Sequence, residues 1–381
     1  MKPNSLQKQL LQKHRNNYRW IYNKAVNILD SSQNRNQEFE SLVSRLNTKK
    51  EKIEKSSTSN YYSKFELRNL IVPEAVNSRT PWVLESGFQI RANAVFEAHK
   101  NFKTNIDLVK NGKKKFFYIK YKTKKDKKWT IDLCKENINY KTYCNKTEFS
   151  LYEESGFIKS TEKFEINHDC SIHFDGIHYY LLVPYEKTVK ESNADNFFVS
   201  LDPGIRKFQT CYSPDSNVNI IGENASEKIY KLLLMIDKAI SNKNKKLEIK
   251  LRIRVKNLQK ELHDKTSRFL CENYRNIYIP KLTEENDIIN KKSRNLKTKT
   301  VRNMVLLAHC AFVEKLKTKA LEYTNVKVQI VTEEYTSQTC LKCHTRTKTS
   351  NEIFKCNNCS FKIDRDILGS RNILLKTWNL M

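Results

Sequence analysis

Two pairs of cysteines in the C-terminal part of this 381-residue chain constrain its fold more than any other feature. Their spacing is Cys340-x2-Cys343-x12-Cys356-x2-Cys359. Four thiolates from two tight turns complete a tetrahedral shell at about 2.3 Å per bond, which suits Zn²⁺ and leaves no position open for catalysis. The spacing therefore predicts a zinc ribbon that binds one structural zinc ion.

The residue after the second cysteine of each pair departs from the usual pattern. Glycine is usual there, whereas this chain has His344 and Ser360. We expect slightly weakened turn geometry and an unchanged set of metal ligands.

The other six cysteines do not form a second motif, because they are scattered singly through the chain. They are Cys134, Cys144, Cys170, Cys211, Cys271 and Cys310. Such a distribution argues against a disulfide framework and predicts a reducing, intracellular compartment.

Basic residues greatly outnumber acidic ones. Lysine and arginine total 70 and aspartate and glutamate 42, so the formal charge is 70 − 42 = +28. A chain with this self-repulsion requires a polyanionic partner. The charge gathers mainly in 113–128 and 242–260, where aromatic residues are interleaved, and this predicts a channel that follows phosphates. No apolar stretch approaches the ~18 residues of a membrane span, so we expect no membrane partner.

The hydrophobic period changes along the chain. Helical spacing over 6–105 gives way to alternation over 113–133 and to a hairpin pattern around Asp175-Gly176, which together predict a small antiparallel sheet or barrel. Beyond 196 the pattern predicts an RNase H-like α/β domain, whose opening is three strands and then a long helical region. The expected elements are strands at 197–202, about 207–212 and about 218–221, a long charged helical region over 224–273, strand 277–279, helix about 299–323, strand 326–332 and a helix from about Asp366.

Aspartates occupy two places in the sequence, a strand end and a helix start, where carboxylates can bind catalytic metal ions. Asp202 ends the apolar strand FFVSLD, and Asp364-Arg365-Asp366 opens the last helix. Turn formation and helix capping are the structural roles open to them, capping above all for Asp364. At strand ends of an RNase H-like sheet, such carboxylates suit two Mg²⁺ ions that bridge a scissile phosphate.

Five segments resemble the TnpB and Fanzor family of transposon-encoded RNA-guided DNA endonucleases, which are relatives of the type V CRISPR effectors. In chain order they are RWIYNKAV, LDPGIRK, TVRNMVLLAHCAFVEKL, EEYTSQTCLKCH and CNNCSFKIDRDILGSRNIL. The resemblance covers nearly the whole chain in motif order. It implies an α+β multidomain protein with a helical recognition lobe, a small antiparallel wedge barrel, and an α/β RuvC domain with an inserted zinc ribbon.

The resemblance also implies a division into parts. Residues 1–30 would form a wedge-associated N-terminal helix, 31–108 the recognition lobe, and 109–195 the wedge β-barrel. The RuvC nuclease domain would span 196–381, with its ribbon inserted at about 336–363.

The implied activity is RNA-guided, Mg²⁺-dependent hydrolysis of phosphodiesters in target DNA. The implied partners are a guide RNA derived from the transposon end and double-stranded target DNA, bound by a monomeric ribonucleoprotein that works in the nucleus if the host is a eukaryote. Asp202 would be the first catalytic carboxylate and Asp366 the last, both as ligands of two Mg²⁺ ions. Leu368 departs from the family, whose members often have asparagine there.

The middle carboxylate is displaced relative to TnpB. In IYIPKL, Pro280 stands where TnpB has its glutamate, and Fanzor proteins resemble this chain in having that proline and a glutamate just before Tyr-Thr-Ser. Glu333 matches the second position. The strand ending there should run parallel to the Pro280 strand about 4.8 Å away, within reach of a flexible glutamate. Glu334 is the rival, but successive strand residues face opposite sides, and we favour Glu333.

Two other readings remain open from the sequence. Pro280 motivates a protein without nuclease activity, either an RNA-guided repressor or a transposon accessory factor. The other is a guide-independent zinc-ribbon DNA-binding protein or transposase.

Overall fold

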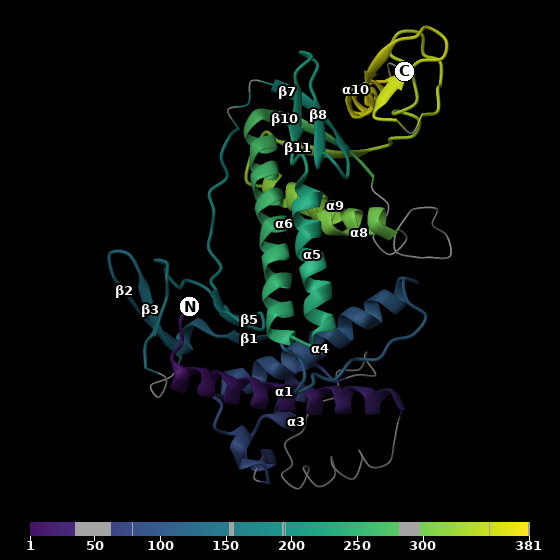
Figure 1. Ribbon diagram of the computed structural model, residues 1–381. Helices are drawn as coiled ribbons and strands as arrows, with labels where there is room; N and C mark the ends of the chain where they lie inside the picture. The colour runs from purple at the N-terminus through teal and green to yellow at the C-terminus, as the bar shows by residue number, and fades with distance from the viewer. Residues whose placement is uncertain are drawn as a thin grey trace. The chain divides into compact units, whose positions relative to one another are not determined.

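The computed structural model describes residues 1–34, 62–77, 79–151, 156–192, 194, 196–281, 298–349 and 351–379. The chain divides into two compact units, unit 1 (residues 1–186) and unit 2 (residues 187–381), each shown in Figure 1. Within the described ranges, no helix is long and apolar enough to span a membrane. Residues 35–61 of the expected recognition lobe lie outside the described residues.

Helices form the first part of unit 1, as the periodicity predicts. Their bounds are α1 Ser5–Asn34, α3 Lys64–Ile71 and α4 Phe88–Lys110, with short 3-10 turns η1 Glu74–Asn77 and η2 Pro81–Val83. A capping box starts α3, in which Ser63 Oγ accepts the N–H of Glu66 and the Glu66 carboxylate accepts the N–H of Ser63. Small and aliphatic side chains bury the faces of α1 and α4: Ile21, Ala25, Leu29, Ala94, Val95 and Ala98.

Two three-stranded antiparallel sheets complete unit 1, in the orders β1-β5-β6 and β2-β3-β4. The strands are β1 Trp129–Leu133, β2 Ile138–Thr142, β3 Thr147–Leu151, β4 Ile158–Lys159, β5 Cys170–Phe174 and β6 Tyr179–Leu182, with a 3-10 turn η3 Lys135–Asn137. The hairpin predicted around Asp175 is confirmed, because its carboxylate accepts the N–H groups of Ile177 and His178 at 2.8 Å. Closure of the two sheets into one barrel stays a prediction.

The strand expected over 113–133 is only partly present. Residues 129–133 form β1, whereas 113–128 are irregular and mostly exposed. Lysines crowd this stretch on both faces of the expected strand, so neighbouring like charges would oppose a paired ladder. The stretch is instead a solvent-facing basic segment.

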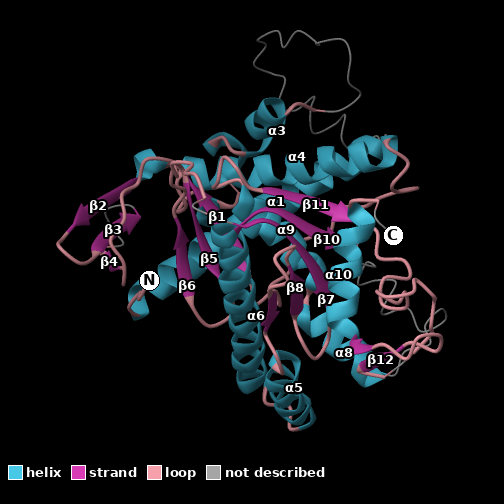
Figure 2. Cartoon of the chain, turned by 90° about the horizontal axis from the view of Figure 1, so that it is seen from above, coloured by secondary structure: helices cyan, strands magenta, loops and turns pink. Residues whose placement is uncertain are grey.

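Unit 2 contains a five-stranded sheet in the order β11-β10-β7-β8-β9 (Figure 2). The strands are β7 Asn196–Pro203, β8 Gln209–Tyr212, β9 Val218–Ile221, β10 Tyr274–Pro280 and β11 Lys327–Val331. β10 is parallel to both β7 and β11, and the other two pairs are antiparallel. The strand positions predicted from the sequence are confirmed to within a few residues.

Long helices accompany this sheet, and α5 and α6 lie side by side (Figure 1). The helices are α5 Ala225–Ser241, α6 Lys245–Asn273, α8 Thr298–Leu307, α9 His309–Ala320 and α10 Arg365–Thr377, and the ribbon adds strands β12 Ile353–Lys355 and β13 Lys362–Asp364. The single helix expected over 299–323 is wrong, because Ala308 adopts left-handed backbone at φ 48° and separates α8 from α9. The break brings His309 against Phe208, with the two rings stacked at 5.0 Å.

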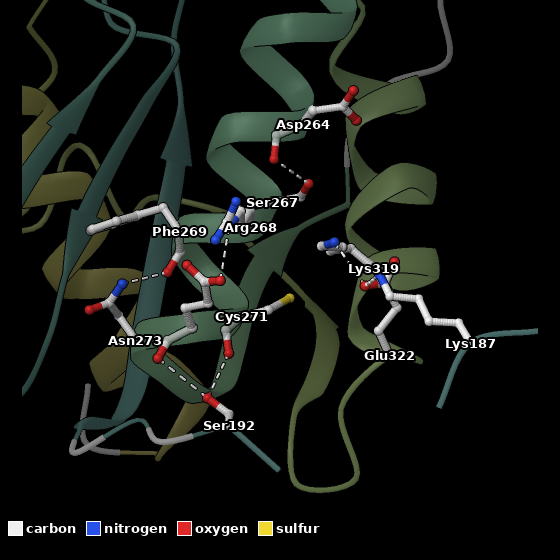
Figure 3. A network of polar contacts seen from close by, with 11 residues as sticks. Lys187, Ser192, Asp264, Ser267, Arg268, Phe269, Cys271, Asn273, Lys319 and Glu322 are labelled. Carbon is white, nitrogen blue, oxygen red and sulfur yellow. Dashed lines mark hydrogen bonds and ion pairs between the residues drawn. The ribbon is translucent and has the colours of Figure 1, made fainter. Parts of the chain in front are cut away.

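The segment that enters β7 is fastened to the ends of two helices (Figure 3). Ser192 Oγ donates to the carbonyl of Cys271 at 2.7 Å and more weakly to that of Glu272 at 3.4 Å, at the C-terminal end of α6. Lys187 forms an ion pair with Glu322 just beyond α9. These contacts hold the segment that leads into β7 against the C-terminal ends of α6 and α9.

Candidate active site and metal centre

Asp202 lies at the end of β7, the central strand of the unit 2 sheet. Val199 and Leu201 are fully buried in the core formed with α6 and α9. Because strand residues alternate between the two faces, Ser200 and Asp202 point to the opposite side, where α10 packs. The apolar strand thus delivers a carboxylate to the face covered by the last helix.

α10 approaches β7 most closely at two small, buried residues, Gly369 and Ser370. Ser200 Oγ donates to the Ser370 carbonyl at 2.6 Å. A Cβ atom at Gly369 would lie only 2.4 Å from Asp202 Oδ2. Glycine therefore leaves the space that the Asp202 carboxylate fills.

The two aspartates that open α10 have different environments. Asp364 Oδ1 accepts the N–H groups of Asp366 at 2.9 Å and Ile367 at 3.2 Å, which confirms its predicted capping role. Asp366 Oδ2 lies 3.4 Å from Lys207 Nζ, which is also 2.7 Å from Asp364 Oδ2. Burial alone would raise the pKa of Asp364 and lower the pKa of Lys207. The ion pair between Lys207 and Asp364 outweighs burial, so the pKa of Asp364 is lowered and the pKa of Lys207 is raised.

Glu333 comes from the segment that follows β11. In the parallel pair of β10 and β11, Pro280 lies opposite Val331, and the N–H of Lys281 donates to the Val331 carbonyl at 2.9 Å. The parallel arrangement predicted for these strands is confirmed. Glu333 follows two residues after that pair, so it leaves the sheet at the same edge as Pro280.

The neighbouring glutamates 333 and 334 differ in their surroundings. The Glu334 side chain is 78% exposed, and its carboxylate lies 3.9 Å from the Lys376 ammonium. Glu333 is exposed as a whole residue, but its carboxyl group lies against the protein, and this burial raises its pKa. Of the two, Glu333 is the glutamate whose charge acts on Asp202.

Buried Asn372 on α10 fixes the chain that follows Glu333. Its side-chain amide donates to the carbonyl oxygens of Thr336 and Thr339, both at 2.8 Å. Thr336 Oγ1 donates in turn to the Glu333 carbonyl at 2.8 Å. One helix therefore organises the surroundings of all three carboxylates.

The electrostatics of this site favour a bound cation. The pKa of Asp202 is raised to about 8, first by burial and then by the negative charges of Asp366 and Glu333. Within the described residues, the oxygens of these three carboxylates do not all come within 4.8 Å of one another. Carboxylate oxygens are the ligands that Mg²⁺ prefers, and its charge would offset the repulsion. The residues present fit divalent ions.

The four cysteines of the predicted ribbon converge. Cys340 Sγ lies 3.6 Å from Cys359 Sγ, Cys343 Sγ lies 3.5 Å from Cys356 Sγ, and all four sulfurs are within 4.8 Å of one another. A tetrahedral zinc–thiolate shell has sulfur–sulfur edges of about 3.8 Å. The Lys342 N–H also points at Cys340 Sγ at 3.4 Å. The four thiols therefore fit one structural zinc ion.

Both metal-binding turns form without glycine. His344 and Ser360 adopt left-handed backbone, with φ of 56° and 54°. Their N–H groups donate to the carbonyls of Cys340 and Cys356 at 3.1 Å, which closes each turn. Left-handed backbone costs a residue with a Cβ atom about 1–2 kcal/mol, which is the physical reason why these turns are weaker without glycine.

Ser360→Gly is expected to stabilise the zinc-loaded ribbon, because glycine adopts this backbone without strain. We expect a gain of about 0.5–1 kcal/mol, seen as a higher melting temperature. Asn358→Gly in the same turn is the matched control, since Asn358 has ordinary backbone and bonds Thr345 Oγ1 at 3.3 Å. A stabilisation by the control that equals the stabilisation by Ser360→Gly would contradict the strain explanation.

Leu368 joins the ribbon to α10. It is fully buried in one cluster with Phe354, Cys340 and Cys356. The departure from the family's asparagine thus has a packing role, because an amide at this position would be buried among apolar atoms.

Sequence reasoning does not identify three residues that surround the carboxylates: Lys207, Gly369 and Asn372. Gly369 carried a signal, since it is one of only seven glycines and lies inside a helix just after Asp366. Lys207 and Asn372 look like ordinary polar residues until the fold brings their partners to them.

Comparisons with known proteins show what this chain is similar to. A family model described as "Cas12f1-like, TNB domain" matches residues 309–373, which include Glu333, the four cysteines and Asp366. A putative transposase, A625R of Paramecium bursaria Chlorella virus 1, is 27% identical over 99% of this chain and 85% of its own length. TnpB-like protein L79 of Acanthamoeba polyphaga mimivirus is 30% identical over 52% of this chain, which spans only 42% of that relative.

The chain is a relative of the TnpB-like proteins. An archaeal member, MJ0751 of Methanocaldococcus jannaschii, is 26% identical over 52% of this chain and 74% of its own length. The fold is similar to that of Cas12f1 solved in complex with sgRNA and target DNA, with a TM-score of 0.51 over 96% of this chain and 82% of that one, at 13% identity. The resemblance to TnpB-type proteins that the motifs indicate is thereby confirmed.

Proposed function

We propose that the chain is an RNA-guided DNA endonuclease of transposon origin, of the Fanzor type. Its RuvC site would be formed by Asp202, Glu333 and Asp366, which would hold two Mg²⁺ ions. When bound, such ions activate water and stabilise the leaving oxygen in phosphodiester hydrolysis. The four cysteines would hold one structural Zn²⁺.

One observation carries this proposal: Glu333 and Asp366, from two separate segments, both act through their charges on Asp202 at the end of β7. Asp202 ends the central strand, Glu333 follows the edge strand, and Asp366 begins the helix across them. Burying like charges together destabilises a fold unless a ligand offsets them, which is why such clusters mark functional sites. The strand order, with β7 and β10 parallel and β7 to β9 antiparallel, supports an RNase H-like RuvC domain.

The remaining assignments follow from the same relatives and stay proposals. The sheets and helices of unit 1 would form the recognition lobe and wedge, and unit 2 the nuclease domain and ribbon. The Cas12f1 structure that shares this fold contains sgRNA and target DNA, which supports a guide RNA and double-stranded DNA as partners. The net charge of +28 supports the same partners. We propose an intracellular, monomeric ribonucleoprotein.

Pro280 favours a second candidate, an RNA-guided or zinc-ribbon DNA-binding protein that does not cut. Proline at this position removes the carboxylate that TnpB has there. Glu333 restores an acidic side chain at the same sheet edge, which is why we rank the nuclease first.

Sequencing the nucleic acid that copurifies with the protein tests the proposed partner. We expect a small set of defined RNA species bound in the presence of ribonuclease inhibitor. Recovery of only heterogeneous fragments, equally abundant with a matched basic protein, would overturn RNA guidance and favour a guide-independent DNA-binding protein.

Gly369→Val is expected to lower the cleavage rate about tenfold or more, because the larger side chain displaces the Asp202 carboxylate. The measurement is single-turnover cleavage at saturating Mg²⁺. Ser370→Ala is the control, since only the backbone carbonyl of Ser370 bonds Ser200. Wild-type cleavage by a folded Gly369→Val protein would show that the carboxylate position is unimportant.

A further inference from the structure

Lys207 is anchored beside the carboxylate site by contacts that leave one of its hydrogen-bond donors unused. It lies in the turn between β7 and β8, and its side chain is only 15% exposed. Its ammonium group is 2.7 Å from Asp364 Oδ2 and 3.4 Å from Asp366 Oδ2. An ammonium has three N–H donors, and among the described residues only these two carboxylates pair with this one.

Asp364 is itself held in place. Its other oxygen accepts two N–H groups at the start of α10, so it cannot turn away from Lys207 without losing the helix cap. The long lysine side chain is consequently fixed at the ammonium end. An anchored cation costs less conformational entropy when it binds a further anion than a mobile surface lysine does.

We propose that the Lys207 ammonium binds a non-bridging oxygen of a nucleic-acid phosphodiester at the carboxylate site. The proposal rests on the proposed function. A cation held by Asp366 would weaken the 3.4 Å contact between Asp366 Oδ2 and Lys207 Nζ, and this would free a second N–H donor of Lys207. Asp364 would keep the lysine in place throughout. Lys207 is then a catalytic residue that contacts substrate.

Other cations nearby are less suited to this contact. Arg206 is 51% exposed and forms an ion pair with Glu352. Lys376 contacts the carboxylate and the carbonyl of Glu334. Arg365 acts on Asp202 through its positive charge, but no ion pair anchors it within the described part of the chain. Lys207 is the cation that the capping aspartate and the proposed metal ligand orient together.

The salt dependence of nucleic-acid binding tests the contact without requiring cleavage. The full chain with its copurified RNA is titrated with matched target DNA in Ca²⁺ at several salt concentrations. Lys207→Met should reduce the slope of log K against log salt by about 0.7–0.9, the loss of one phosphate contact. Lys207→Arg should keep the wild-type slope. The control is Lys317→Met on α9, which removes an ion pair with Glu314 and should not change the slope.

A purely structural role for Lys207 predicts a different pattern. In that case Lys207→Met lowers the melting temperature and leaves the slope of the folded protein unchanged, which overturns the proposal. A second measurement distinguishes loss of the contact from misfolding. Single methylphosphonates are placed along the target strand, and the binding of each modified DNA to the wild-type protein and to Lys207→Met is measured. One position should weaken wild-type binding several-fold and have no further effect on Lys207→Met, whereas equal effects at every position in both proteins overturn the contact.

Failure of the proposed function gives a distinct result. One outcome is that the wild-type protein never cuts, while Lys207→Met lowers the slope of log K against log salt and one methylphosphonate position is coupled to Lys207. The phosphate contact then stands and the nuclease assignment fails. If the protein cuts and neither coupling appears, the nuclease assignment stands and the contact fails.

Discussion

Glu333→Gln is expected to abolish DNA cleavage while leaving guide RNA and target binding nearly unchanged. The substitution removes one negative charge at almost constant shape from a site where divalent ions need carboxylates to offset their repulsion. We expect a loss of roughly a hundredfold or more in single-turnover rate, which corresponds to about 3 kcal/mol of transition-state stabilisation. The metal-free protein should not become less stable. Burial raises the pKa of Asp202 most, followed by the negative charges of Asp366 and Glu333, so removing the Glu333 charge also removes a repulsion.

Glu334→Gln is the matched control for this prediction. Its side chain is largely exposed and faces Lys376, so most activity should remain. A complementary test is Pro280→Glu in the Glu333→Gln protein, which returns a carboxylate to the neighbouring strand and should recover some cleavage. If Glu333→Gln cuts at the wild-type rate and Glu334→Gln is inactive, the choice between the neighbours is wrong.

Cys356→Ser is expected to lose the structural zinc and unfold the ribbon while the rest of unit 2 stays folded. Cys356 is buried and its sulfur is one of four that converge, so its loss removes a ligand and leaves a hydroxyl that binds zinc weakly. Elemental analysis should give about one zinc per wild-type chain and close to none in the variant. Cleavage should fall as well, because Leu368 packs the ribbon core against the helix that carries Asp366.

The exposed Cys144 provides the control for zinc content. It lies outside the cluster, so Cys144→Ser should retain the metal in full. Native protein that contains no zinc after purification without chelators would refute the ribbon assignment.

Local patterns were enough to predict the elements that carry the site. The apolar strand that ends in Asp202, the cysteine spacing and the aspartates at the start of the last helix are each contained in a short stretch of sequence. Such features are predictable because period, capping and ligand spacing depend on neighbours in the chain. Strand alternation, which favours Glu333 over Glu334 in the sequence, does not apply to these residues, because β11 ends at Val331 and both glutamates follow it. The two differ instead in exposure, since the Glu334 side chain is in solvent.

The residues that position the site could not be predicted in this way. Asn372 acts through carbonyl groups of Thr336 and Thr339, and Lys207 acts through Asp364, all distant in the sequence. The break at Ala308 is not predictable from the local sequence, since alanine favours helix, and the His309 that follows the break stacks on the distant Phe208. Tertiary contacts decided each of these features.

Cleavage of DNA matched to the copurified RNA is the most direct test of the nuclease assignment. Wild-type protein, its RNA and Mg²⁺ are incubated with DNA that carries the complementary sequence in varied flanking contexts, and with scrambled DNA. We expect cleavage of the matched DNA only, abolished by EDTA and by Asp202→Ala. Cleavage that persists in Asp202→Ala, or binding of matched DNA without cleavage across all flanking sequences and metals, would contradict it.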